Sequence, residues 1–283
     1  MTIPAMGANN SRYATRTTGR AAICPWRSVS AAQTGWLLGA ILRGGTAGTT
    51  QGLAGMLLGL VRRLRARCPQ AQLILRGDCG FGTAAVLSLC GRLKLDFLLG
   101  LTRNARLQQL STPTQMDAAL KYRWAGEGCR EFGEFSYQAG SWPTAARVLV
   151  KAEITQGELN PRYVVTSLTG EPEELYQTYC ARGDRENRWQ EFKLDLAAGR
   201  TSCTTFLANQ ARLLWHVAAA LLCLAVRLAA SGTQWQAAQV GALRTRLFKI
   251  GARVVQSTRR IWWHLPTSCP LQADWVAIAL RLC

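Results

Sequence analysis

One short stretch, residues 72–101, constrains the fold more than any other part of the chain. It begins with an apolar run of strand length that ends at Asp78, and it closes with a second apolar run from Asp96 to Leu101. Residues 84–94, between the two runs, have the spacing of a helix. Strand, helix and strand at this separation predict a right-handed unit with two parallel strands. Asp78 is therefore expected at the carboxyl end of a strand, where open α/β sheets bind their ligands.

The flanking sequence extends this unit on both sides. Residues 36–43 are apolar and predict a buried strand, and residues 53–64 carry apolar side chains at helical spacing. Residues 103–170 look different, because their sequence predicts short β segments separated by turns. A helix is expected to begin near residue 171, and beyond residue 200 we expect the chain to be helical.

The chain is strongly basic. It has 34 Lys and Arg against 16 Asp and Glu, which gives a net charge of +18 and a pI near 10.2. An excess of this size predicts a polyanionic partner, most often nucleic acid, and an acidic membrane surface is the competing interpretation. Asp78 is the first acidic residue in the sequence.

Neither the cysteines nor the most apolar segment indicates a secreted or membrane protein. We interpret the ten cysteines as reduced, mostly buried side chains of a cytosolic protein, because no apolar signal segment precedes them. A zinc finger is disfavoured, since the chain has two histidines and no Cys-x-x-Cys pair. Residues 213–230 are long enough to span a membrane, but His216 and Arg227 within them favour a buried helix.

Four functional side chains recur at helical spacing between residues 179 and 193. Tyr179, Arg182, Glu186 and Lys193 are 3, 4 and 7 residues apart, which places them in one narrow stripe of a helix. A solvated face with ion pairs is the simpler interpretation of such a stripe, as a turn former is for Asp78. A carboxylate can also hold a divalent cation, and the Arg, Lys and Tyr beside it can hold phosphate oxygens. Together, Asp78 and Glu186 predict a metal site.

These residues carry a resemblance to a known family. The pattern Tyr-x2-Arg-x3-Glu-x6-Lys is the signature of one large group of bacterial DDE insertion-sequence transposases, and the chain has it with every spacing intact. Leu-Arg-Gly-Asp at 75–78, Gly-Leu-Thr-Arg-Asn at 100–104 and Leu-Phe-Lys-Ile-Gly at 247–251 also resemble one subgroup of that family. The resemblance runs from about residue 36 to about residue 265.

The resemblance implies a ribonuclease-H-like α/β fold. Its mixed sheet would carry flanking helices, a β-rich insertion and a helical C-terminal part. The implied segments are an unrecognised, poorly ordered extension (1–35), the first part of the core (36–102), the insertion (103–170), the catalytic-glutamate helix with the C-terminal helices (171–265) and a tail (266–283).

The resemblance also implies two-metal phosphoryl transfer at insertion-sequence ends. Asp78 would be the second Asp of the Asp-Asp-Glu triad and Glu186 its Glu, and both would bind Mg²⁺ or Mn²⁺. Tyr179, Arg182 and Lys193 would contact the DNA backbone. The implied partner is double-stranded DNA with insertion-sequence terminal repeats, with a homodimer as one possible assembly. The implied location is the bacterial cytoplasm, at the nucleoid, without a membrane.

The chain departs from the family at its front. Family members carry the first catalytic Asp on the first strand of the sheet, whereas this chain has no acid before Asp78. We therefore expect a truncated, inactive copy whose sheet lacks its first strand or strands and exposes hydrophobic edges. Two alternatives stay open: a basic nucleic-acid-binding protein without catalysis, and a membrane-associated helical protein.

Overall fold

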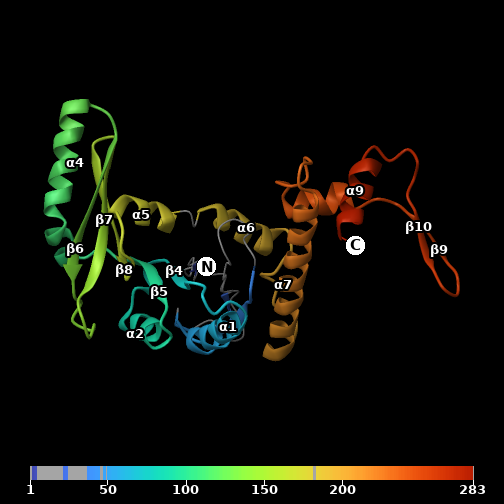
Figure 1. The fold of residues 1–283 in the computed structure, drawn as a ribbon, viewed down its shortest axis with the longest axis horizontal. Helices are drawn as coiled ribbons and strands as arrows, with labels where there is room; N and C mark the ends of the chain where they lie inside the picture. Colours follow the sequence, from blue (N-terminus) through green and yellow to red (C-terminus); the bar gives the residue numbers. More distant parts are fainter. Residues whose placement is uncertain are drawn as a thin grey trace. The chain divides into compact units, whose positions relative to one another are not determined.

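The computed structural model describes residues 2–4, 22–24, 37–44, 47–48, 50–180 and 183–282. The chain divides into two compact units, Met1–Arg185 and Glu186–Cys283. A mixed sheet dominates the first unit, and helices dominate the second (Figure 1).

The centre of the first unit is a six-stranded sheet with the order β1-β4-β5-β8-β7-β6. Its strands are β1 (Thr2–Pro4), β4 (Ile74–Gly77), β5 (Asp96–Leu101), β6 (Cys129–Tyr137), β7 (Ala146–Thr155) and β8 (Glu158–Thr166). β1, β4 and β5 are parallel, and the strands from β5 through β8 and β7 to β6 pair antiparallel. A separate ribbon pairs β2 (Ala22–Cys24) with β3 (Ile41–Arg43). This mixed α/β sheet, flanked by helices, confirms the predicted fold class.

Helices cover both faces of the sheet in the first unit. They are α1 (Leu53–Arg67), α2 (Ala84–Arg92), α3 (Ala105–Leu110), α4 (Thr112–Ala125) and α5 (Pro172–Cys180). Leu99 of β5 lies in a buried cluster with residues of α1 and α2, whereas Leu98 lies in a second cluster with Tyr176 of α5. Successive strand residues point to opposite faces, so α5 and the α1–α2 pair contact different faces of β5. The predicted strand–helix–strand unit is confirmed as β4, α2 and β5.

The structure corrects two predictions of secondary structure in the first unit. Residues 105–125, where we expected β segments and turns, form α3 and α4. α4 carries exposed apolar side chains, Met116, Leu120 and Trp124, as well as the buried Ala118, so its apolar residues do not gather on one face of the helix. The strand expected at 36–43 is limited to Ile41–Arg43.

A strand lies beside β4, where we expected the sheet to lack one. β1 pairs in parallel with β4, with Ile3 opposite Leu75, so backbone hydrogen bonds cover the edge of β4 over three residues. Pairing of this kind needs only extended backbone, and β1 adds no acidic residue to the sheet. Apart from β1 and β2, residues 1–35 lie outside the described part of the chain.

The second unit is built around one long helix. Its elements are α6 (Gly183–Leu194, which begins in the first unit), α7 (Phe206–Ala229), α8 (Val240–Ala242), the π-helical turn η2 (Leu243–Phe248), β9 (Arg253–Gln256), β10 (Ile261–His264) and α9 (Gln272–Leu282). The expectation of helix throughout this region is wrong for β9 and β10, which form an antiparallel hairpin. Their Val, Ile and Trp side chains favour strands, and this preference outweighs the helical spacing of the basic residues Arg246, Lys249 and Arg253.

Two expectations about buried residues also need correction. α7 is long and apolar enough to cross a membrane by length and composition, yet a buried core helix passes the same test, and 28% of its most apolar window is buried. The burial expected for this helix is therefore partial. The structure describes the side chains of eight cysteines, all of them free thiols, and two of them, Cys90 and Cys223, are buried. Most described cysteines are thus not the buried side chains that we expected.

Candidate functional site

Asp78 lies at the carboxyl edge of the parallel strands, directly after β4, as predicted. Its Oδ1 accepts the N–H of Gly80 at 3.0 Å, which caps the short 3₁₀ helix η1 (Cys79–Phe81). The Phe81 ring is fully buried and anchors this turn in the core. Asp78 therefore forms a turn and also follows the end of a strand. Its half-buried carboxylate fits both interpretations given above, a turn former and a candidate metal ligand.

Glycines allow this turn to approach β5 closely. A Cβ atom on Gly82 would lie 2.6 Å from the carbonyl oxygen of Gly100. A Cβ atom on Gly100 would lie 2.7 Å from the hydroxyl of Tyr179, 2.9 Å from the Cys79 nitrogen and 3.1 Å from the Asp78 carbonyl carbon. Real Cβ atoms do not come this close to other atoms, so only glycine fits at position 100 without a shift. The Asp78 turn and Tyr179 meet at this glycine.

The helix α5 brings Tyr179 to this edge. The guanidinium of Arg76, on β4, is 2% exposed, and its Nη1 donates to the carbonyl oxygen of Thr178 in the last turn of α5. A cation at the C-terminus of a helix complements the carbonyl groups that lack helical partners. The Tyr179 ring also lies 5.9 Å from the Tyr176 ring, centroid to centroid. Arg76 and Tyr176 thus position the first residue of the Tyr-Arg-Glu-Lys pattern.

The remaining residues of the pattern belong to α6 or to the segment before it. Arg182 and the side chain of Glu186 lie outside the described residues. In the second unit, Glu191 of α6 accepts a hydrogen bond from Arg227 of α7 at 2.6 Å, and Arg227 is 4% exposed. Asp195, just after α6, accepts from the Gly241 nitrogen of α8 at 2.7 Å. These contacts tie one face of α6 to α7 and α8.

Helical geometry then locates positions 186 and 193 relative to those contacts. At about 100° per residue, Glu191 and Asp195 lie about 140° and about 180° around the helix from position 186. Lys193 lies about 20° from it. Positions 186 and 193 therefore share the face of α6 opposite the residues that tether it.

The described residues do not fit a complete two-metal centre. They contain no group of three or more His, Cys, Asp or Glu that could hold a metal ion. Asp78 supplies one carboxylate at this edge, and one of its oxygens already accepts a backbone N–H. Asp96, the next acid in sequence, pairs with Ile74 at the opposite end of β4 and accepts from Gln72 and Ser167 at 2.7 and 3.0 Å. Four residues of strand, about 13 Å, separate the level of Asp96 from that of Asp78.

A cavity of about 330 Å³ lies beside the Asp78 turn, and our sequence analysis did not predict it. Its polar and aromatic lining residues include Cys79, Thr83, Thr102, Asn104, Tyr137 and Trp142. Thr83 and Asn104 are the N-caps of α2 and α3, and Asn104 also donates to the Tyr137 hydroxyl at 3.3 Å. The sequence does contain a signal for these two lining residues: each is of a type that commonly caps a helix and stands directly before a helix.

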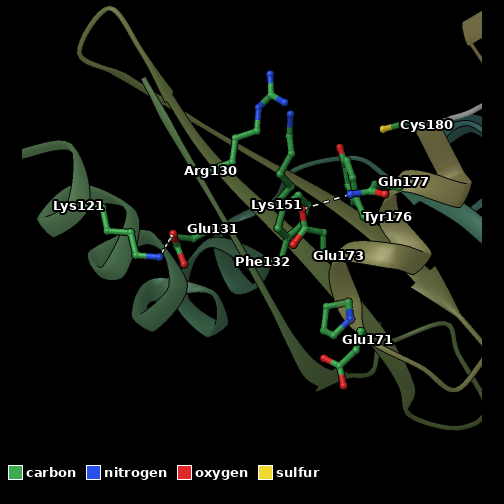
Figure 2. Close-up of a pocket in the computed structure, with 11 residues that line it drawn as sticks. Lys121, Arg130, Glu131, Phe132, Lys151, Glu171, Glu173, Tyr176, Gln177 and Cys180 are labelled. Carbon is green, nitrogen blue, oxygen red and sulfur yellow. Dashed lines mark hydrogen bonds and ion pairs between the residues drawn. The ribbon is translucent and has the colours of Figure 1, made fainter. Parts of the chain in front are cut away.

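A larger cavity, of about 500 Å³, lies between α4, β6, β7 and α5 (Figure 2). Its cations have acidic partners: Lys121 pairs with Glu131 at 2.5 Å, and Arg130 and Lys151 both pair with Glu153 at 2.6 Å. The wall includes Tyr176, whose pKa is raised above its usual value by burial. Since each of these cations has an acidic partner, the cavity is a poor candidate for a phosphate site.

We expect Gly100→Ala to destabilise the first unit by about 1–3 kcal/mol, the usual effect of overpacking a core. The new methyl group would collide with the Tyr179 hydroxyl and with the backbone of Cys79, and backbone cannot rotate away as a side chain can. Thermal unfolding should show a melting temperature several degrees lower.

The matched control is Gly91→Ala on α2, where a Cβ atom would meet nothing within 4 Å. Alanine is the better helix former, so this variant should gain about 0.5–1 kcal/mol. Equal melting temperatures for the two variants would contradict the close approach at Gly100.

Comparison with known proteins gives a match that covers nearly the whole chain. A family model described as "Transposase DDE domain group 1" matches residues 28–282, which is nearly the whole chain. The match begins before residue 36 and ends after residue 265, so it is wider than the resemblance carried by the sequence motifs. A search of the curated proteins finds no match.

Proposed function

Because this chain belongs to the DDE transposase family, we propose that its site derives from one that cleaves and joins phosphodiester bonds at insertion-sequence ends. Asp78 and Glu186 are the proposed catalytic carboxylates. The observation that carries this proposal is the meeting of the Asp78 turn with Tyr179 at Gly100, at the carboxyl edge of the parallel strands. Residues about 100 positions apart in sequence are brought together where α/β sheets bind ligands.

Divalent metal ions are generally used by this family, and Asp78 and Glu186 are the proposed ligands for Mg²⁺ or Mn²⁺. A bound ion would supply stabilisation of the negative charge that develops at the phosphate. Two carboxylates provide fewer ligands than a two-metal centre needs, so we propose that this chain holds at most one ion, and weakly.

Transposase function implies DNA binding, and we propose that Tyr179, Arg182 and Lys193 contact the DNA backbone close to the two carboxylates. The Tyr179 hydroxyl and the Asp78–Cys79 peptide both lie within 3.1 Å of the position that a Cβ atom on Gly100 would take, which supports this assignment. Position 193 shares a face of α6 with position 186, opposite the face tethered by Glu191 and Asp195. The proposed DNA is the terminal repeat of the insertion sequence itself, bound by a homodimer.

We further propose that this chain is an inactive transposase, because no acid precedes Asp78 in the sequence and β1 contributes none. The family match does not favour the alternative of a nucleic-acid-binding protein without catalytic ancestry. Members of the family are typically soluble cytoplasmic proteins, and one apolar helix is weak support for a membrane protein. We retain 36–102 and 171–265 as the two parts of the catalytic core, with 103–170 as its insertion.

Binding to a terminal-repeat duplex tests this proposal. We expect Arg182→Ala and Lys193→Ala each to weaken binding about tenfold, because each removes a charged partner of a phosphate. Affinity can be measured with the full chain and a labelled duplex. Arg92→Ala is the control, because exposed Arg92 ends α2 at the amino edge of β5, away from Asp78. If neither pattern variant binds less tightly than this control, these DNA contacts are wrong.

A further inference from the structure

β9 and β10 form a ribbon, residues 253–264, that we call the arginine hairpin. Arg253 pairs with His264 at its base, and Gln256 pairs with Ile261 near its tip. The Ser257 nitrogen donates to the Arg260 carbonyl oxygen at 2.8 Å, and the Arg260 nitrogen donates to the Ser257 hydroxyl at 3.2 Å. This closed turn places Arg259 and Arg260 at the tip.

Every side chain that the structure describes in the arginine hairpin is exposed. Its apolar members are no exception: Val254 is 52%, Ile261 59% and Trp262 50% exposed. An isolated two-stranded hairpin is only marginally stable in water, and contiguous exposed apolar side chains usually mark an interaction site. The exposed apolar side chains therefore indicate that the arginine hairpin binds another molecule.

The charge of the arginine hairpin has a single sign. Arg253, Arg259 and Arg260 are its charged residues, Lys249 precedes it, and no acid occurs in the sequence between Asp195 and Asp274. The Arg260 guanidinium lies 5.8 Å from the centroid of the Trp262 ring, close enough for a cation–π interaction. Guanidinium groups bind phosphate oxygens in a bidentate manner, so this surface is complementary to the phosphodiester backbone of a nucleic acid.

The length and width of the hairpin suit the major groove of B-form DNA. Four residues of strand extend about 14 Å, and paired strands lie about 4.8 Å apart. The major groove of B-form DNA is about 12 Å wide and accepts a two-stranded ribbon. We propose that the arginine hairpin is a DNA-binding ribbon that enters the major groove, with Arg253, Arg259 and Arg260 on the phosphates. This inference rests on the proposed function, which makes duplex DNA the partner, and adds a contact outside the Tyr-Arg-Glu-Lys pattern.

The test compares the full-length chain with the triple variant Arg253→Ala/Arg259→Ala/Arg260→Ala. Binding to a terminal-repeat duplex is measured over a series of salt concentrations. Each lost phosphate contact lowers the slope of log affinity against log salt by about 0.9, so the triple variant should lose about 3 units of slope. The control is Arg67→Ala/Arg92→Ala, which removes exposed arginines from the ends of α1 and α2 and should leave the slope nearly unchanged.

A second measurement needs no variant. Duplex DNA should protect Arg259 and Arg260 of the unmodified chain from an arginine-specific reagent, while Arg67 and Arg92 stay reactive. An unchanged slope together with unprotected tip arginines would overturn the inference. The proposed function would survive that result if Lys193→Ala still weakened binding, and would fail with it if the wild-type chain bound no DNA. A triple variant that lost dimers or binding to anionic vesicles, with its DNA slope intact, would also overturn the inference.

Discussion

The purified chain is expected to cleave or join no strand of its own terminal-repeat DNA in Mg²⁺ or Mn²⁺. The proposed two-metal phosphoryl transfer needs carboxylates to hold the ions, and the resemblance to the family implies one of them on the first strand of the sheet. This chain has no acid before Asp78, and the strand that pairs with β4 supplies none. Loss of such a group at a phosphoryl-transfer site lowers the rate by several powers of ten.

The measurement is the appearance of nicked or joined strands from an end-labelled duplex. Nicking by the wild-type chain that disappears in Glu186→Gln would show that the site is complete and that the expectation is wrong. Asp96→Asn is the matched control for loss of an acid, because Asp96 lies at the opposite end of the parallel strands and is engaged by Gln72 and Ser167. Any activity that is present should survive that substitution.

The second large effect is the dependence of DNA affinity on salt concentration. With a net charge of +18, the chain should bind duplex DNA tightly at low salt and lose affinity steeply as salt rises. A protein that neutralises about six to ten phosphates loses about 10³ to 10⁵ in affinity between about 50 and 200 mM salt, because condensed counterions are released on binding. Fluorescence anisotropy of a labelled duplex across this range measures the slope.

An unrelated duplex of the same length is the control for this experiment. Phosphate contacts carry no direct sequence information, so its slope should be nearly the same even where its affinity is lower. Affinity that stayed constant between low and moderate salt would contradict an electrostatic footprint, whatever the sequence of the DNA.

Local patterns explain which parts of the fold could be predicted. β4, α2 and β5 follow from apolar runs and helical spacing within 30 residues, and the handedness of parallel connections leaves little choice in their arrangement. α4 escaped prediction because Met116, Leu120 and Trp124 lie on its exposed face, so apolar residues are not confined to the face that packs on the sheet. β9 and β10 escaped because basic residues at helical spacing lie beside residues that prefer strands.

The features of the candidate site also fall into two groups, those predictable from the sequence and those visible only in the tertiary structure. The sequence by itself determined the basic charge, the spacing of the Tyr-Arg-Glu-Lys residues and the position of Asp78 at the end of a strand, since each depends on residue types and short spacings. Tertiary structure alone decided that Arg76 bonds to Thr178, 102 residues away, and that Tyr179 meets the Asp78 turn at Gly100. Such contacts depend on where the last turn of α5 lies against β4 and β5. Apolar periodicity specifies which face of a helix is buried, but not which distant residue lies opposite it.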